Sequence, residues 1–237
     1  MSPVSNLWVY LATQPLFWLT LTLAAYLTGD WLARASGRNP FVNPVMIAVA
    51  IVMAVLFATG TPYERYFDGA QFVHVLLGPA TVALAVPIIR NRALIRRAWK
   101  AIAIALVIGS ATGVISAVVL GAAFGLSPQV LLSVAPKSVT AAIAMGIAEK
   151  TGGIASLTAV VVILTGIIGA VIVTPLMNAL RIKDFAARGF AAGLAAHGIG
   201  TARALAVNET AGTFAGLAMA LNGLMTACLI PLLLLLW

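Results

Sequence analysis

Long stretches without a charged side chain constrain this fold most strongly. The runs 101–136, 151–180 and 211–237 contain no Asp, Glu, Lys or Arg. Each is long enough to cross the hydrocarbon core of a bilayer, about 30 Å thick, which takes roughly 20 helical residues. Only 8% of all residues are charged, whereas a soluble domain carries roughly 25%. The sequence therefore predicts an all-α polytopic membrane protein, with 1–237 as a single membrane domain.

The basic residues predict how the spans are oriented. Five bases occur without an acid in the stretch 90–100: Arg90, Arg92, Arg96, Arg97 and Lys100. Because cytoplasmic loops carry an excess of Lys and Arg, this stretch is predicted to be cytoplasmic. Counting outward through an interrupted span at 71–89, a short apolar segment at 44–60 and a first span at 7–29 places the N-terminus outside. A further span at 101–124 follows the bases.

The C-terminal half leaves two topologies open. If 127–150 crossed the membrane fully, Arg181, Lys183 and Arg188 would end outside, against the distribution of positive charge. A re-entrant segment at 127–153 puts these bases inside, and we favour it. The prediction is then about six full spans and two broken or re-entrant segments of half depth, which approach from opposite faces. Secondary transporters commonly bind substrate between such broken helices.

We accordingly divide the domain by expected role. Residues 1–125 are predicted to be mainly scaffold and oligomerisation spans, with one broken helix at 71–89. Residues 126–237 are predicted to form the core, with broken segments near 133–150 and 190–206.

One candidate site lies around a pair of glycines in the second broken segment. Gly198 and Gly200 weaken a helix because glycine loses more backbone entropy on ordering than any other residue. His197, Thr201 and Arg203 flank this predicted break, and polar groups inside a bilayer mark a functional site by default. His197 could also carry a coupled proton. The alternative is that Arg203 extends to the interface and His197 is a satisfied core residue.

A second candidate site follows Pro136. Proline is suited to the first position of a helix, and the N–H groups of a helix N-terminus attract anions. Lys137, Ser138 and Thr140 add a cation and two hydroxyls, which suits a small carboxylate. The alternative is a solvated outer loop. Glu149 is a possible proton carrier, although an acid beside Lys150 is more typical of a helix end.

Three weaker observations complete the residue-level analysis. Gly78-Pro79-Ala80-Thr81 matches Gly198–Thr201 at two of four positions, so Pro79 and Thr81 would join the site if the chain contained an inverted repeat. Asn222 is interpreted as an ordinary interhelical hydrogen-bonding residue. The sequence has no nucleophile-elbow, zinc-protease or phosphate-loop motif, so we expect neither an enzyme nor a cofactor or metal site.

A series of motifs resembles the LrgB/CidB family of bacterial membrane proteins, which is related to the plant plastid glycolate/glycerate translocator. The series comprises 77–87, Pro136-Lys137-Ser138-Val139-Thr140, Gly152-Gly153-Ile154, 157–160, Thr165-Gly166, 181–184, Arg188-Gly189 and 197–204. One departure is notable: the family usually continues the lysine motif with Thr and Pro, whereas this chain has Ala141-Ala142.

The resemblance implies two functions. One is a holin- or antiholin-like component that affects murein hydrolase activity and lysis beside a small LrgA/CidA-like membrane partner. The other is carriage of small monocarboxylates such as glycolate, glycerate, pyruvate or lactate. The paired donor-rich breaks favour the carrier, working by an elevator-type movement. We further expect a homo-oligomer, a dimer, in the bacterial inner membrane, with no nucleic-acid partner.

Overall fold

The computed structural model describes residues 14–235, apart from the side chains of His74, Leu77 and Thr81. The start of the predicted first span, 7–13, lies outside this part. Every regular element in the described residues is a helix, which confirms the all-α class. The chain forms two compact units, Met1–Ala85 and Val86–Trp237, which we describe separately.

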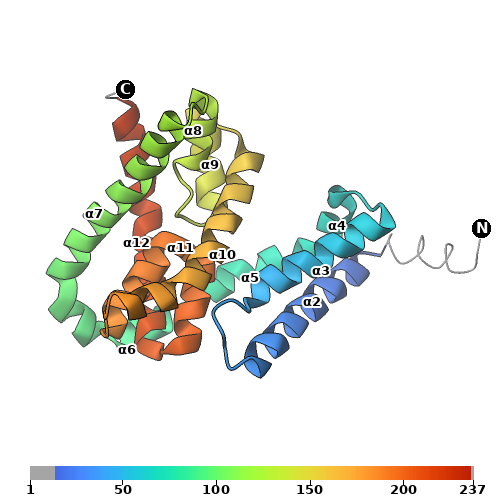
Figure 1. Cartoon of the computed structure of the whole chain (residues 1–237), viewed down its shortest axis with the longest axis horizontal. Helices are drawn as coiled ribbons and strands as arrows, with labels where there is room; N and C mark the ends of the chain where they lie inside the picture. Colours follow the sequence, from blue (N-terminus) through green and yellow to red (C-terminus); the bar gives the residue numbers. More distant parts are fainter. Residues whose placement is uncertain (1–13, 236–237) are drawn as a thin grey trace, which may run out of the picture. The chain divides into compact units, whose positions relative to one another are not determined.

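The described residues of the first unit, 14–85, form α2 (Pro15–Ala35), α3 (Pro44–Thr59), α4 (Tyr63–Ala70) and α5 (Phe72–Ala83) (Figure 1). Proline starts both α2 and α3, where its missing N–H costs nothing. The Asn43 side chain accepts hydrogen bonds from the first amides of α3. A methyl on Gly29 would lie 2.6 Å from the Pro44 carbonyl oxygen, so glycine lets α2 and α3 approach closely.

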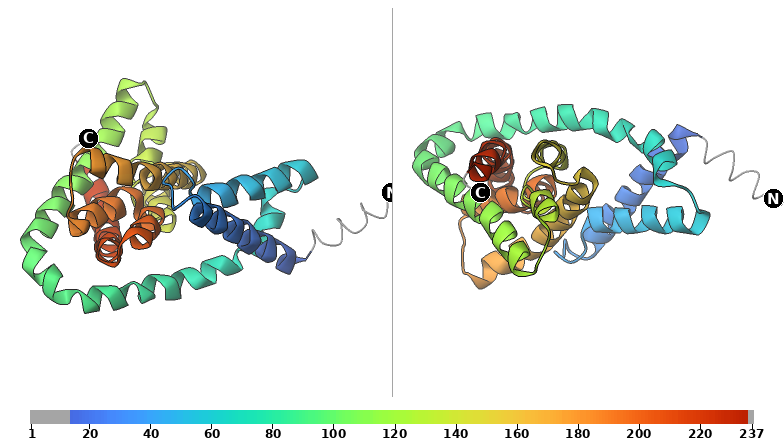
Figure 2. Two further views of the ribbon diagram at one scale, coloured as in Figure 1. Left: turned by 60° about the horizontal axis from the view of Figure 1, so that its bottom comes forward. Right: turned by 90° about the horizontal axis from the view of Figure 1, so that it is seen from above.

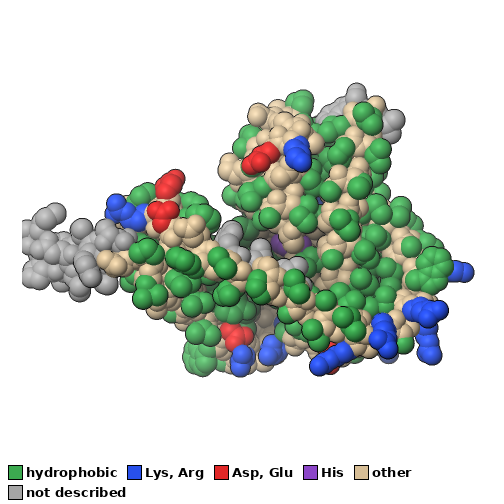
Figure 3. Space-filling model, turned by 180° about the vertical axis from the view of Figure 1, so that it is seen from behind, with side chains coloured by type: hydrophobic (Ala, Val, Ile, Leu, Met, Phe, Trp, Pro, Cys, Tyr) green, Lys and Arg blue, Asp and Glu red, His purple; other side chains and the backbone are tan. Residues whose placement is uncertain are grey.

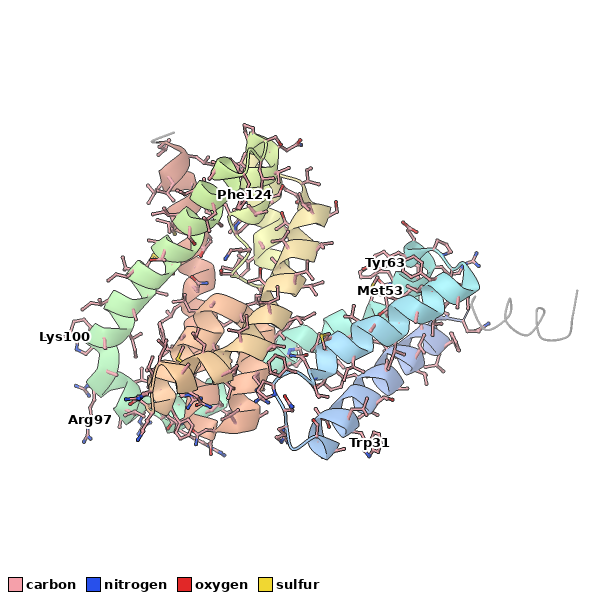
Figure 4. The ribbon with its side chains drawn as sticks, viewed as in Figure 1. Trp31, Met53, Tyr63, Arg97, Lys100 and Phe124 are labelled. Carbon is pink, nitrogen blue, oxygen red and sulfur yellow. The ribbon has the colours of Figure 1, made fainter. Side chains whose placement is uncertain are left out.

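The second unit begins within the short α6 (Ala85–Arg90), after its first residue, and continues with the long α7 (Arg92–Ala123). Leu84 separates α6 from α5, within the segment predicted to be interrupted. The 32 residues of α7 extend over about 48 Å, more than the hydrocarbon thickness. Its basic first turns therefore belong to the span's own helix and not to a loop, because Arg and Lys are good helix formers. Arg97 and Lys100 lie near one end and Phe124 at the other (Figure 4).

Two short helices and a long one follow α7. The short ones, α8 (Pro128–Val134) and α9 (Ala141–Thr151), are joined by residues 135–140, and α10 (Ala155–Ala179) follows. Eleven residues rise only about 16 Å as a helix, so α9 cannot cross the membrane. We call 128–151 hairpin 1. The Ser133 hydroxyl accepts a hydrogen bond from the Ile154 N–H at 2.7 Å, which ties its open end to the start of α10.

The helix α11 (Phe185–Val207) is long enough to span, but its chain reverses halfway. Ala196 and His197 have non-helical backbone angles, and His197 has φ of 40°. A methyl on Gly200 would lie 2.5 Å from the Ala192 carbonyl oxygen, whereas eight residues of straight helix span about 12 Å. Residues 185–195 and 198–207 are therefore two antiparallel arms of one re-entrant segment, which we call hairpin 2.

Close packing holds the first arm of hairpin 2 against α12 (Glu209–Leu234). Methyl groups on Gly189 and Gly193 would overlap the Ala211 and Ala215 carbonyl groups. Small residues four apart let two helices approach at backbone distance, which is the usual basis of helix packing in membranes.

The two hairpins enter from opposite faces of the second unit. Leu131 of hairpin 1 packs on Gly121 near the end of α7, whereas Phe190 of hairpin 2 packs near Ile95 at the start of α7. Figure 2 shows α7 along the outside of the other helices of the second unit in both views. The basic residues of α7 and those that follow α10 thus lie on the face of the second unit from which hairpin 2 enters. Figure 3 shows Lys and Arg side chains along the lower edge of the view. The positive-inside rule predicts that this face is the cytoplasmic one.

Candidate functional site

The tips of the two hairpins meet at the side chain of Asn222. Its amide nitrogen donates one hydrogen bond to the Ser138 carbonyl oxygen of hairpin 1, at 3.2 Å, and another to the Leu194 carbonyl oxygen of hairpin 2, at 2.9 Å. Two segments separated by more than fifty residues are therefore both bonded to the same nitrogen atom. The sequence-based prediction that the two broken segments face one another agrees with this geometry.

The meeting point lies at the middle of the spanning helices. Asn222 is at the centre of α12, and its oxygen accepts a hydrogen bond of 2.6 Å from Ser110, close to the centre of α7. Hairpin 2 contacts α10 at Val162 and Gly166, also near its middle. Since each of these helices is long enough to cross a bilayer, the tips lie near half depth.

His197 forms the tip of hairpin 2 and is buried. Its Nε2 lies 2.9 Å from the Val162 carbonyl oxygen, which can only accept, so Nε2 donates and Nδ1 has no proton in the neutral ring. A methyl on Gly166 would lie 2.7 Å from the His197 ring, so only glycine leaves room for it. The Thr201 hydroxyl donates to the His197 carbonyl oxygen, four residues earlier in the chain, at 2.8 Å.

The structure places the break slightly earlier than the glycine pair. Ala196 and His197 leave the helical conformation, and Gly198 and Gly200 lie inside the second arm. Gly198 is exposed, with Met219 Sδ as the nearest neighbour of an added methyl. Gly200 is required for the close approach of Ala192. The glycines therefore let the two arms close together, and the reversal itself falls on the two preceding residues.

Lys137, Ser138 and Thr140 lie together at the tip of hairpin 1 and are all partly buried. The Lys137 ammonium donates to the Ser138 hydroxyl at 3.4 Å. Within the part of the chain that the structure describes, no carboxylate oxygen lies within 4 Å of this ammonium. Thr140 is the residue before α9, and its side chain makes no capping hydrogen bond to the α9 amides. Ala141-Ala142 form the first turn of α9.

The charges at the tips of the two hairpins favour a negatively charged ligand. Two helices start at the tips, namely α9 and the second arm of hairpin 2, and the N-terminus of each carries a partial positive charge. Lys137 adds a full charge. The six acidic residues of the chain lie in or beside helix ends and the short α4: Asp30, Glu64, Asp68, Glu149, Asp184 and Glu209.

Arg203 lies in a different part of the hairpin from His197. It lines a small pocket with Arg188, Thr174 and Phe185 at the open end of hairpin 2. The six residues after His197 rise about 9 Å along the second arm. Arg188 donates to the Asn178 side-chain oxygen at 2.8 Å. The structure thus bonds the tip of hairpin 1, which carries Lys137 and Ser138, and the first arm of hairpin 2, just before His197, to Asn222. It groups Arg203 with Arg188.

The remaining predicted residues are placed as follows. Pro79 is exposed on α5 of the first unit, and the Thr81 side chain lies outside the described part. Glu149 is exposed in the last turn of α9, at the open end of hairpin 1. Asn222 was missed as a site residue; the available signal was a lone amide in an otherwise apolar run. Within the described residues, no three His, Cys, Asp or Glu side chains are grouped to hold a metal ion.

The fold and site define a multi-pass membrane protein with two opposed re-entrant hairpins. The model of the LrgB-like family matches residues 22–236, and the chain belongs to this family. It is 33% identical to YwbG of Bacillus subtilis strain 168 over 91% of this chain and 96% of that protein. It is 31% identical to the holin-like protein CidB of Staphylococcus aureus over 94% of this chain and 97% of that protein. No solved structure matches.

Proposed function

We propose that this protein is a carrier that binds a small monocarboxylate between the tips of hairpins 1 and 2. The observation that supports the proposal is that both tips are bonded to one buried amide at half depth. Helix ends that meet inside a bilayer are how many secondary transporters bind substrate. The substrate class follows from charge and from the family resemblance: a two- or three-carbon acid such as glycolate, glycerate, pyruvate or lactate.

Lys137 is the residue proposed to attract the anion. A cation inside a bilayer is costly unless it is paired, and the Lys137 ammonium donates its hydrogen bond to a neutral hydroxyl. A carboxylate at the tips would neutralise the ammonium, and Ser138 and Thr140 would orient it through their hydroxyls. Arg203 and Arg188 would meet the anion at the cytoplasmic entrance of hairpin 2, before it reaches the tips.

His197 is proposed to carry a coupled proton. Its Nε2 is held by the Val162 carbonyl, so Nδ1 is the nitrogen that can take up a proton. A proton there would offset the charge of one monocarboxylate during transport. Glu149, exposed at the opposite face, is a second candidate for proton exchange with solvent. We further propose a homodimer in the bacterial inner membrane, an elevator-type movement of the hairpins, and no enzymatic activity.

A holin-like role is the second candidate, and the names of the relatives support it better than they support transport. The Staphylococcus relatives are called holin-like proteins, and their names mention no carboxylate. In this role the protein would modulate cell lysis, with a small LrgA/CidA-like membrane protein as partner. A pore does not need a bonded pair of re-entrant tips, which is why we place the carrier first.

Uptake into liposomes separates the two candidates. Wild-type protein should take up labelled glycolate or pyruvate and retain a dye much larger than either. Lys137→Met should reduce uptake at least tenfold, whereas Lys150→Met, which removes an exposed cation from the end of α9, should leave it unchanged. Dye leakage that is insensitive to Lys137→Met would support the pore. No uptake across a panel of two- and three-carbon acids would count against the carrier.

A further inference from the structure

The side-chain amide of Asn222 makes four hydrogen bonds, two through its nitrogen and two through its oxygen. Its nitrogen donates to the two tips, and its oxygen accepts from Ser110 of α7 and from Thr226, at 2.6 and 3.2 Å. The side chain is 1% exposed. A buried polar network is stabilising when every member is satisfied, and costly when one member loses its partner. The amide therefore specifies one arrangement of four segments.

The two halves of the amide have different structural roles. The oxygen side bonds hydroxyls of two long helices, α7 and α12 itself. The nitrogen side bonds carbonyl oxygens of Ser138 and Leu194, which belong to short segments that reverse inside the membrane. At membrane depth, irregular backbone persists only where its polar groups find partners in protein or in a water-filled cavity. Only the nitrogen side supplies that partner to both tips.

We infer that Asn222 is a positioning residue that fixes the spacing between the two hairpin tips. This inference rests on the proposed function in one respect, since that spacing would set the width of the anion site. The structural part stands without it. The tips are expected to move as one body while both bonds are intact, and to separate when the nitrogen is replaced by an oxygen.

Asn222→Asp tests the nitrogen side selectively. The oxygen that faces Ser110 and Thr226 is retained, while the donor to the tips is replaced by a group that can supply at most one hydrogen bond. Thr226→Val is the matched control, because it keeps the side-chain shape and removes one bond to the oxygen side of the same amide. Both substitutions remove hydrogen bonds from the cluster around Asn222, but only Asn222→Asp removes the donor to the two tips and should let them separate.

The readout is the magnetic coupling of two spin labels in the full-length protein. Labels are attached at Ile143→Cys and Gly198→Cys in a Cys228→Ser background, since Cys228 is the single native cysteine and is exposed. Both labelled positions are exposed, and they lie against Gly223 and Met219, one turn apart on α12. Dipolar broadening of the spectrum therefore reports the separation of the two tips without any transport measurement.

We expect strong broadening in the otherwise unsubstituted protein and in Thr226→Val, and its loss in Asn222→Asp. Broadening that is unchanged in Asn222→Asp would overturn the inference, and so would an equal loss in Thr226→Val. Should Asn222→Asp fail to fold, Asn222→Ser, which keeps a single donor, takes its place under the same criteria. If uptake exists, Asn222→Asp should raise its apparent KM at least tenfold. If the broadening responds as expected but the protein takes up no carboxylate, the proposed carrier function is refuted and the positioning role of Asn222 is not.

Discussion

Gly198 and Gly200 lie two residues apart on hairpin 2, and replacing each with Ala tests whether α11 doubles back. In a continuous helix both changes would stabilise the protein by about 0.5–1 kcal/mol, because Ala has the higher helix propensity. In the reversed chain they differ. A methyl at 198 meets only Met219 Sδ at 3.9 Å, whereas a methyl at 200 meets the Ala192 carbonyl oxygen at 2.5 Å and Ala196 Cβ at 2.7 Å.

The size of the difference follows from these contacts. A carbon atom approaches a carbonyl oxygen to about 3.3 Å, so Gly200→Ala must push the two arms apart by roughly 0.8 Å. Forcing an extra methyl into a packed interior costs about 1–3 kcal/mol. The propensity gain is common to both variants, so Gly200→Ala should be less stable than Gly198→Ala by this overpacking cost.

Thermal unfolding of the two variants in one detergent, followed by circular dichroism, measures this difference. One kcal/mol corresponds to about 2–4 °C for a chain of this length, so the midpoint of Gly200→Ala should be lower by about 2–12 °C. Gly198→Ala should unfold at or slightly above the wild-type temperature. Equal midpoints for the two variants would refute the reversal at Ala196–His197 and, with it, the description of hairpin 2.

Two other predictions concern topology and coupling. Cysteines introduced at Glu149 and Lys183, in the Cys228→Ser background, should react with a membrane-impermeant maleimide from opposite sides of the membrane; labelling of both from one side would contradict the opposed hairpins. His197→Gln keeps a side-chain donor for the Val162 carbonyl and removes the titratable Nδ1, so uptake into liposomes should persist but lose its response to a pH gradient; uptake that still follows the gradient would exclude His197 as the proton carrier.

The fold class could be predicted from the sequence because the lengths of the apolar runs and the positions of the basic residues are visible without knowledge of tertiary contacts. Runs without charge indicate spans, and the bases after 180 favour a re-entrant segment before α10. The helical first turns of α7 were not predicted, since a basic stretch between spans reads as a loop. Its continuous 32-residue helix reflects the high helix propensity of Arg and Lys.

The site was readable only in part. Lys137, Ser138 and His197 could be singled out because each is a polar residue within an apolar segment, and this contrast is visible in the local sequence. The role of Asn222 depends on contacts with Ser138 and Leu194, which are 84 and 28 residues away. The position of the break is likewise set by packing, because the His197 ring fits only against Gly166 of another helix. Such pairings are properties of the folded chain and leave no local pattern.

Protection of a cysteine at position 198 tests most directly whether an anion binds at the tips. Gly198 is exposed beside His197, so Gly198→Cys in the Cys228→Ser background should react with a small maleimide at a measurable rate. The carrier account predicts that glycolate or pyruvate slows this reaction several-fold, that choline does not, and that Lys137→Met abolishes the protection. A reaction rate that no small carboxylate changes would contradict the account.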